Sequence, residues 1–319
     1  MVGKVTPNDM LSASRIPAVC GMSKYRSPND ELLSSIDFLK GLTPPDIGNE
    51  AMAWGNRLEP TILMEAANRL GCSQLEIEHP TPYFHDKWPL CCSLDGTATG
   101  NMEEVFTDPE KGIYVVGSDS ILLSGTGIIE AKLTSMPAED VLPLYRGPIQ
   151  LQAQMAIFKA TWGAIATLYQ GTELRIFLFK QHPATLELIE KTCKEFQAKL
   201  DYWDETGEVD YYPPINPKDA ARTFSAGSDS EPVVLDNYVE ELTKLLLENK
   251  AKITKAEEEN SKIQTEIMGI MQNHTHGIAG QYQISWPTRS YKAKPATITP
   301  AKEAYTIRQS TLTIKELSK

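Results

Sequence analysis

The residues with the clearest chemical potential are an acid and a lysine in the segment Ile128-Ile129-Glu130-Ala131-Lys132. Two β-branched residues at its start favour a strand, and side chains two positions apart on a strand point to the same face. Glu130 and Lys132 are therefore expected to project together, with Ala131 directed into the body of the protein. Asp95 follows an apolar run at a predicted turn and supplies a second carboxylate.

Two carboxylates and a backbone carbonyl suit a divalent metal ion. Here Asp95, Glu130 and the carbonyl of Ala131 would hold the ion, which would keep open positions for water and a phosphate oxygen. Lys132 could then orient or deprotonate an attacking water and offset the charge that builds on a phosphate. An acid-x-lysine triplet is common in proteins, and a salt-bridged edge strand is the alternative reading of the triplet alone.

Two predicted helices carry polar side chains that could complete such a site. Glu59 lies in a helix expected over residues 49–70, which Gly71 ends. Gln150 and Gln154 lie one turn apart in a helix expected over 149–162, so their amides share a face. These amides could donate to a phosphate or hold the attacking water.

The motifs, taken in this order, resemble those of the PD-(D/E)XK nuclease superfamily, and within it the phage lambda exonuclease and YqaJ-like viral recombinase family. The resemblance covers roughly residues 10–205 and rests on Ser12-Ala13-Ser14 with Gly21–Pro28, Trp54–Glu59, Ser93–Gly96, Glu130-Ala131-Lys132 and Gln152-Ala153-Gln154. It implies an α/β fold with a mixed central sheet flanked by helices. It also implies catalytic roles for Asp95, Glu130, Lys132, Gln154 and Glu59.

The activity that this resemblance implies is a magnesium-dependent, ATP-independent 5′-to-3′ exonuclease acting on double-stranded DNA, with Mn²⁺ able to replace Mg²⁺. Such an enzyme leaves 3′ single-stranded tails for phage-type homologous recombination. The implied partners are DNA ends, further copies of the chain (a trimer in the lambda relative) and a single-strand annealing protein. The implied location is the cytoplasm of a bacterial host, with the gene carried by a phage or prophage. The alternatives are an endonuclease or nickase on the same core, and a non-catalytic scaffold that binds DNA ends.

The resemblance also indicates which residues contact DNA and the 5′-phosphate, namely Ser14, Arg15, Lys24, Arg26, Arg146 and Gln150. The family has an arginine before the first motif and another after the signature, where this chain reads Pro7-Asn8-Asp9 and Thr134-Ser135-Met136. Arg15, Lys24 and Arg146 are the candidates to take their place.

Composition restricts the other options. The net charge of −11 is the wrong sign for a protein that coats DNA, although it permits a local basic cleft. The 5 cysteines include no C-x-x-C pair, which favours reduced thiols and argues against an iron–sulfur nuclease. No apolar run is long enough to span a membrane. The sequence contains no Walker motif, so ATP hydrolysis is not expected.

The chain is expected to form an exonuclease domain over 1–210, a linker or draped loop over 211–234, and a third region over 235–319. In the last, apolar residues from Leu242 to Ile270 alternate spacings of four and three, with Asn249 and Asn260 in the same seam. This predicts a long heptad helix. A small basic β unit with strands near 305–307 and 312–314 is expected to follow. We also expect a helix at 15–19 capped by Ser12 or Ser14, and a hairpin formed by 113–116 and 120–123.

Overall fold

The computed structural model of the protein describes residues 6–42, 48–77, 79–224 and 233–290. Two compact units result, Met1–Thr223 and Phe224–Lys319, and each is described by itself. The helices of the first unit are α1 (Ile16–Val19), α2 (Pro28–Leu39), α3 (Glu50–Arg69), α4 (Pro148–Phe158), α5 (Pro183–Thr206) and α6 (Pro217–Thr223), with short 3₁₀ turns at Pro109–Lys111 and Leu144–Arg146.

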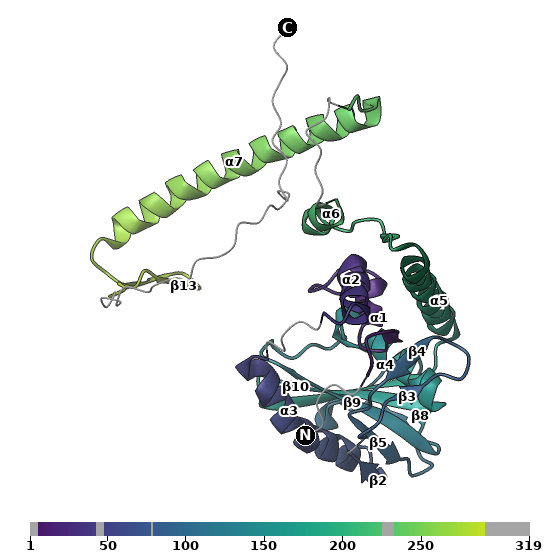
Figure 1. Cartoon of the computed structure of the whole chain (residues 1–319). Helices are drawn as coiled ribbons and strands as arrows, with labels where there is room; N and C mark the ends of the chain where they lie inside the picture. Colours follow the sequence, from purple (N-terminus) through teal and green to yellow (C-terminus); the bar gives the residue numbers. More distant parts are fainter. Residues whose placement is uncertain (1–5, 43–47, 78, 225–232, 291–319) are drawn as a thin grey trace. The chain divides into compact units, whose positions relative to one another are not determined.

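The centre of the first unit is a six-stranded mixed sheet in the order β2-β5-β9-β10-β11-β7 (Figure 1). Its strands are β2 (Ser73–Glu76), β5 (Gly96–Thr99), β7 (Ile113–Val115), β9 (Thr126–Thr134), β10 (Trp162–Tyr169) and β11 (Glu173–Lys180). β9 pairs parallel with β10 and antiparallel with β5. The strands outside this sheet are β1 (Leu11–Ser12), β3 (Tyr83–Phe84), β4 (Leu90–Cys92), β6 (Glu104–Phe106) and β8 (Ser120–Leu122). This is the mixed α/β architecture expected from the sequence.

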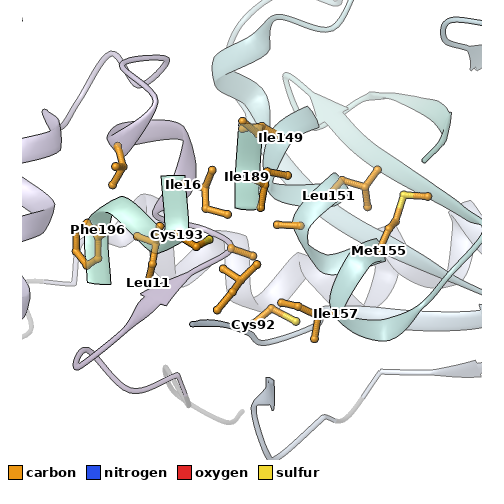
Figure 2. Packing of buried hydrophobic residues seen from close by; sticks show 14 of the residues in the cluster. Leu11, Ile16, Cys92, Ile149, Leu151, Met155, Ile157, Ile189, Cys193 and Phe196 are labelled. Carbon is orange, nitrogen blue, oxygen red and sulfur yellow. The ribbon is translucent and has the colours of Figure 1, made fainter. Parts of the chain in front are cut away.

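Helices bury both faces of the sheet. On one face, Ile62, Leu63 and Ala66 of α3 pack in a cluster with Ile129 and Ala164. On the other face, buried side chains of α1, α4 and α5 meet Ile128 and Ile165, and Figure 2 shows part of this cluster. Because both faces are covered, β10 reads as a nearly continuous apolar run. Gly127 is needed where β9 passes the buried ring of Trp162, since a Cβ atom there would lie 2.1 Å from the indole.

Three local predictions were wrong: a hairpin, the end of one helix and the cap of another. The segments 113–116 and 120–123 form no hairpin, because β7 pairs in parallel with β11 while β8 pairs with β6. The helix expected over 149–162 ends at Phe158, where Lys159 adopts a left-handed conformation and the chain turns into β10. The helix expected at 15–19 is present, but no side chain caps it, so neither Ser12 nor Ser14 has that role.

The segment expected as a linker or draped loop, 211–234, begins as part of the first unit. Asp219 of α6 is buried and accepts hydrogen bonds from Ser27 Oγ at 2.8 Å and from Asn29 Nδ2 at 3.2 Å. Tyr212 donates its backbone N–H to Asn29 Oδ1 at 2.8 Å. These bonds tie 212–219 to α2, so the first unit extends to Thr223.

The second unit contains the expected long helix, α7 (Asn237–Met271), and a hairpin of β12 (His276–Ala279) and β13 (Tyr282–Ser285). Asp236 caps α7 by accepting the N–H of Val239 at 3.1 Å. The strands expected at 305–307 and 312–314 lie outside the described residues. Within the described ranges, no helix is both long and apolar enough for a membrane span.

Candidate active site

The predicted site lies at the edge of β9, just beyond Ile129, the last residue of β9 that pairs with β5. β5 begins at Gly96, which pairs with Ile129, and the side chain of Asp95 continues along the same edge. Asp95 Oδ2 accepts the N–H of Ala131 at 2.9 Å. The N–H and C=O of one strand residue point to the same side, so the Ala131 carbonyl also faces the edge that Asp95 occupies.

Glu130 lies at the centre of a dense hydrogen-bond network. Its carboxylate is buried, with the residue 2% exposed. Oε1 accepts from Lys132 Nζ and from Gln150 Nε2, both at 2.6 Å. Oε2 accepts from Gln154 Nε2 at 2.7 Å. The strand alternation expected for Glu130 and Lys132, and the shared helical face of the two glutamines, are therefore confirmed.

The start of α4 sets the position of these glutamines. Gly147 has a φ of 111°, which an L side chain rarely adopts, and Pro148 opens the helix directly after it. A Cβ at Gly147 would lie 3.4 Å from Lys132 Cε, so the turn passes close to the lysine. Gln154 Nε2 also reaches the backbone carbonyl of Ser93 at 3.2 Å and thereby connects α4 to the loop before Asp95.

Burial and like charges shift the titration of the site. Burial, and then the charge of Glu130, raise the pKa of Asp95 well above its usual value. The same two causes raise the pKa of Glu59. Burial by itself would lower the pKa of Lys132, but Glu130 and Asp95 outweigh it, and the net shift is upward. Lys132 therefore keeps its proton at neutral pH.

A cavity of about 400 Å³ opens beside this network. Glu59 lines it from α3, while Ala131, Lys132 and Leu133 line it from β9. The rest of its wall comes from α3 and the residue before it: Asn49, Ala51, Met52, Gly55, Asn56 and Ile62. The structure thus brings the four sequence-predicted residues Asp95, Glu130, Lys132 and Glu59 into one electrostatic neighbourhood, next to a space that can admit a ligand.

The donors present fit a hard divalent cation. Three carboxylates, Glu130, Asp95 and Glu59, each raise the pKa of Lys132, and carboxylate oxygens are ligands that such a cation prefers. Gln154 Oε1 is buried without a hydrogen-bond partner in the described structure, so one further oxygen is available. Among the described residues, no three His, Cys, Asp or Glu side chains are gathered as a ready-made metal cluster.

The residues predicted to contact DNA fall into two groups. Lys24, Arg146 and Gln150 lie near the site or on the turn that leads to it. Lys24 Nζ stands 3.9 Å from the centre of the Tyr145 ring, and the Arg146 guanidinium lies 5.4 Å from the same ring. Arg146 also pairs with Glu139 at 3.0 Å. Sequence reasoning missed Tyr145, although the Gly147-Pro148 helix start that follows it was a usable signal.

The structure does not bring the second group, Ser14, Arg15 and Arg26, to the carboxylates. Arg15 is 6% exposed, and its guanidinium is bound to Glu31 Oε2 at 2.6 Å and to Ser35 Oγ at 2.8 Å. Its prediction as a phosphate contact therefore conflicts with its burial, because its donors are already used inside the fold. Arg26 binds the other oxygen of Glu31 at 2.8 Å. Ser14 is exposed, and its Oγ lies 3.2 Å from that of Ser12.

Comparison with solved structures gives low sequence identity. The alkaline exonuclease LHK-Exo of Laribacter hongkongensis is 20% identical, with 62% of this chain and 90% of that chain covered and a TM-score of 0.44. Its complex with dAMP gives 21% identity, the same coverage and the same TM-score. A phage-related exonuclease of Haemophilus somnus 129PT is 10% identical, with 62% and 96% covered and a TM-score of 0.40. No curated protein matches this chain.

The match to a family model is informative because it covers the site itself. It spans residues 6–160, from the segment before β1 to the end of α4, and the family is described as the YqaJ-like viral recombinase domain. Asp95, Glu130, Lys132 and Gln154 all lie inside the matched range. Residues 6–160 of this chain, which include the site, are therefore similar to the YqaJ-like viral recombinase domain.

Proposed function

We propose that the first unit is a metal-dependent exonuclease that degrades one strand of double-stranded DNA from its 5′ end and leaves a 3′ single-stranded tail. One observation carries the proposal. Asp95 and the Glu130–Lys132 pair meet at an uncovered strand edge beside a cavity. A structural ion pair would need no second buried carboxylate and no adjoining cavity. The family match supports a role in phage-type recombination.

The metal would be held by Asp95, Glu130 and the Ala131 carbonyl, with Glu59 and Gln154 nearby. When bound, Mg²⁺ or Mn²⁺ would supply a Lewis acid for the phosphate and a more acidic water. Burial, and then the charge of Glu130, raise the pKa of Asp95 and of Glu59, and a bound cation would offset both effects. The three carboxylates are thus better accommodated with a bound cation than without one.

The protein side chains would divide the remaining work. Lys132 lies 2.6 Å from Glu130 and lines the cavity, so it would orient a water or offset phosphate charge. Gln150 and Gln154 fix the two oxygens of Glu130 and so hold its carboxylate in one orientation. Lys24 and Arg146 would supply positive charge for the DNA backbone near the start of α4.

The biological setting we propose follows from the family. The enzyme would act in the cytoplasm of a bacterial host on DNA ends, as an oligomer, and would pass its 3′ tails to a single-strand annealing protein. This proposed setting holds only if the site degrades DNA from its ends.

A set of labelled duplexes tests the proposal. A linear duplex with a 5′-phosphate, the same duplex with a 5′-hydroxyl and a covalently closed circle are each incubated with Mg²⁺ or with EDTA. We expect Mg²⁺-dependent loss of the phosphorylated linear duplex, with label released from the 5′ end, and survival of the circle. Cutting of the circle would support an endonuclease or nickase. Binding of ends with no cleavage in Mg²⁺ or Mn²⁺ would support a non-catalytic scaffold.

A further inference from the structure

Within the second unit, helix α7 leaves an apolar face uncovered along its length. Apolar residues at heptad spacing include Leu242, Leu246, Ile253 and Ile263, all exposed, and Ile270 is 76% exposed. In the described part of α7, Met271 is the one buried residue. A helix of 35 residues is about 52 Å long at roughly 1.5 Å per residue, and an apolar face of that length needs a partner.

Asn249 and Asn260 interrupt this face, and their positions are informative. The two asparagines lie symmetrically about the point midway between Ile253 and Ala256. If a second α7 runs antiparallel about that point, Asn249 of each copy faces Asn260 of the other. The amides then pair with each other inside the seam, where a lone amide would lack a partner.

The apolar residues match in the same antiparallel alignment. Leu246 faces Ile263 of the second copy, Leu242 faces Ile267, and Ile253 faces Ala256, so large side chains at the ends meet large ones. The pairing is two-fold symmetric, so every contact occurs twice. A shift by one heptad would place each asparagine against an apolar residue, which makes this register specific.

The flanking charges are complementary in this register as well. Next to the seam, α7 carries Lys250 and Lys252 in its first half and Glu257 and Glu259 in its second half. In the antiparallel alignment, residues that flank the seam on one side face the residues that flank it on the same side in the second copy. Lys250 therefore faces Glu257 of the second copy on one side, and Lys252 faces Glu259 on the other. The ion pair within the helix, Lys244 with Glu240 at 2.6 Å, lies away from these four positions.

A parallel pairing of two α7 helices gives fewer of these charged residues an oppositely charged partner. Lys252 would still face Glu257, but Lys250 would face Leu245 and Glu259 would face Gln264. Each asparagine would meet its own copy at a separate level of the seam. Flanking charges at such positions decide partner and orientation in paired helices.

We propose that α7 is a dimerisation helix that binds α7 of a second copy of this chain in an antiparallel two-fold pair, in the register that sets Asn249 against Asn260. The occupant of the exposed face is therefore this protein itself. Since the nuclease unit precedes α7, the two nuclease units of the dimer are attached at opposite ends of the paired helices. The pairing does not depend on the proposed exonuclease activity.

Sedimentation equilibrium of the full chain tests this directly, with circular dichroism to confirm helix content. The wild-type chain should self-associate, and Leu246→Glu should abolish the α7-dependent step by placing a charge in the seam opposite Ile263. Lys250→Glu should weaken association about tenfold, because two attractive contacts per dimer become repulsive. Lys255→Glu makes the same charge change on the outer side of α7 and should leave association unchanged.

The double variant Lys250→Glu/Glu257→Lys separates the two orientations. In the antiparallel pair it exchanges the two charges and should restore wild-type association. In a parallel pair Lys250→Glu would be nearly silent, and the double variant would be the weaker one, because Lys252 would then face a lysine. That outcome, a monomeric wild-type chain, or a mass that Leu246→Glu does not change, would each overturn the proposal.

Discussion

Lys132 Nζ lies 2.6 Å from Oε1 of Glu130, and the two residues are two positions apart on the same strand. The carboxylate is almost fully buried, whereas the lysine side chain is 29% exposed. Glu130 is thus the fixed member of the pair, held by two glutamines of α4, and Lys132 is the member that meets the cavity. This asymmetry underlies the first prediction.

Replacement of Lys132 by methionine should reduce Mg²⁺-dependent DNA cleavage about 100-fold or more, as expected for loss of a charge that stabilises a transition state. Methionine keeps much of the aliphatic chain, so the fold should persist by circular dichroism. The control is Lys159→Met, because Lys159 pairs with Asp86 at 2.6 Å on the exposed surface. Wild-type turnover in Lys132→Met would remove this residue from the reaction.

Asp95→Asn should stabilise the metal-free protein at neutral pH. The pKa of Asp95 is raised in the folded state, above roughly 3.9 for the unfolded chain, so its ionisation opposes folding at high pH. Stability should therefore rise as pH falls through the raised pKa, and the cost disappears below the unfolded value. Asparagine keeps an oxygen that can accept from Ala131 and carries no charge.

The measurement is thermal unfolding in EDTA from pH 4 to pH 8. The gain from Asp95→Asn should be about 1 kcal/mol or more near pH 7, since one pKa unit corresponds to about 1.4 kcal/mol. It should shrink toward pH 4. A constant difference across this range would show that the Asp95 charge does not act on stability.

Arg15→Ala should destabilise the fold. Removal of this guanidinium leaves Glu31, itself buried, without its closest partner, and such a loss costs about 3 kcal/mol. Arg26→Ala is the matched control, because Arg26 binds the other oxygen of Glu31 but its side chain is 48% exposed. Its cost should stay below about 1 kcal/mol. Urea unfolding of both variants gives the comparison, and equal costs would contradict the structural role of Arg15.

Gly127→Ala should also destabilise the protein, by about 1–3 kcal/mol, through overpacking against Trp162. Gly55→Ala is the control, since nothing lies within 4 Å of a Cβ at Gly55 and the residue is inside α3. Alanine there should be neutral or stabilising by up to about 1 kcal/mol. Unfolding midpoints that place Gly127→Ala at or above wild type would show that β9 and Trp162 can separate without cost.

The sequence by itself determined the features that depend on local periodicity. Strand alternation puts Glu130 and Lys132 on one face, helical spacing does the same for Gln150 and Gln154, and the heptad pattern predicts α7. Each of these follows from backbone geometry over a few residues. No distant segment has to be located before they can be stated.

Only the tertiary structure decided which distant segments meet. The short strands 113–115 and 120–122 have ordinary strand patterns, but each pairs with another strand, β11 and β6, instead of with its neighbour. Arg15 is an arginine in a phosphate-binding motif by sequence, yet the position of α2 supplies Glu31 and buries it. The bond from Ala131 to Asp95 likewise exists because β5 begins at Gly96, directly after Asp95, and its pairing with β9 stops at Ile129. Such pairings depend on the free energy of the whole packed core, and a local pattern does not contain that information.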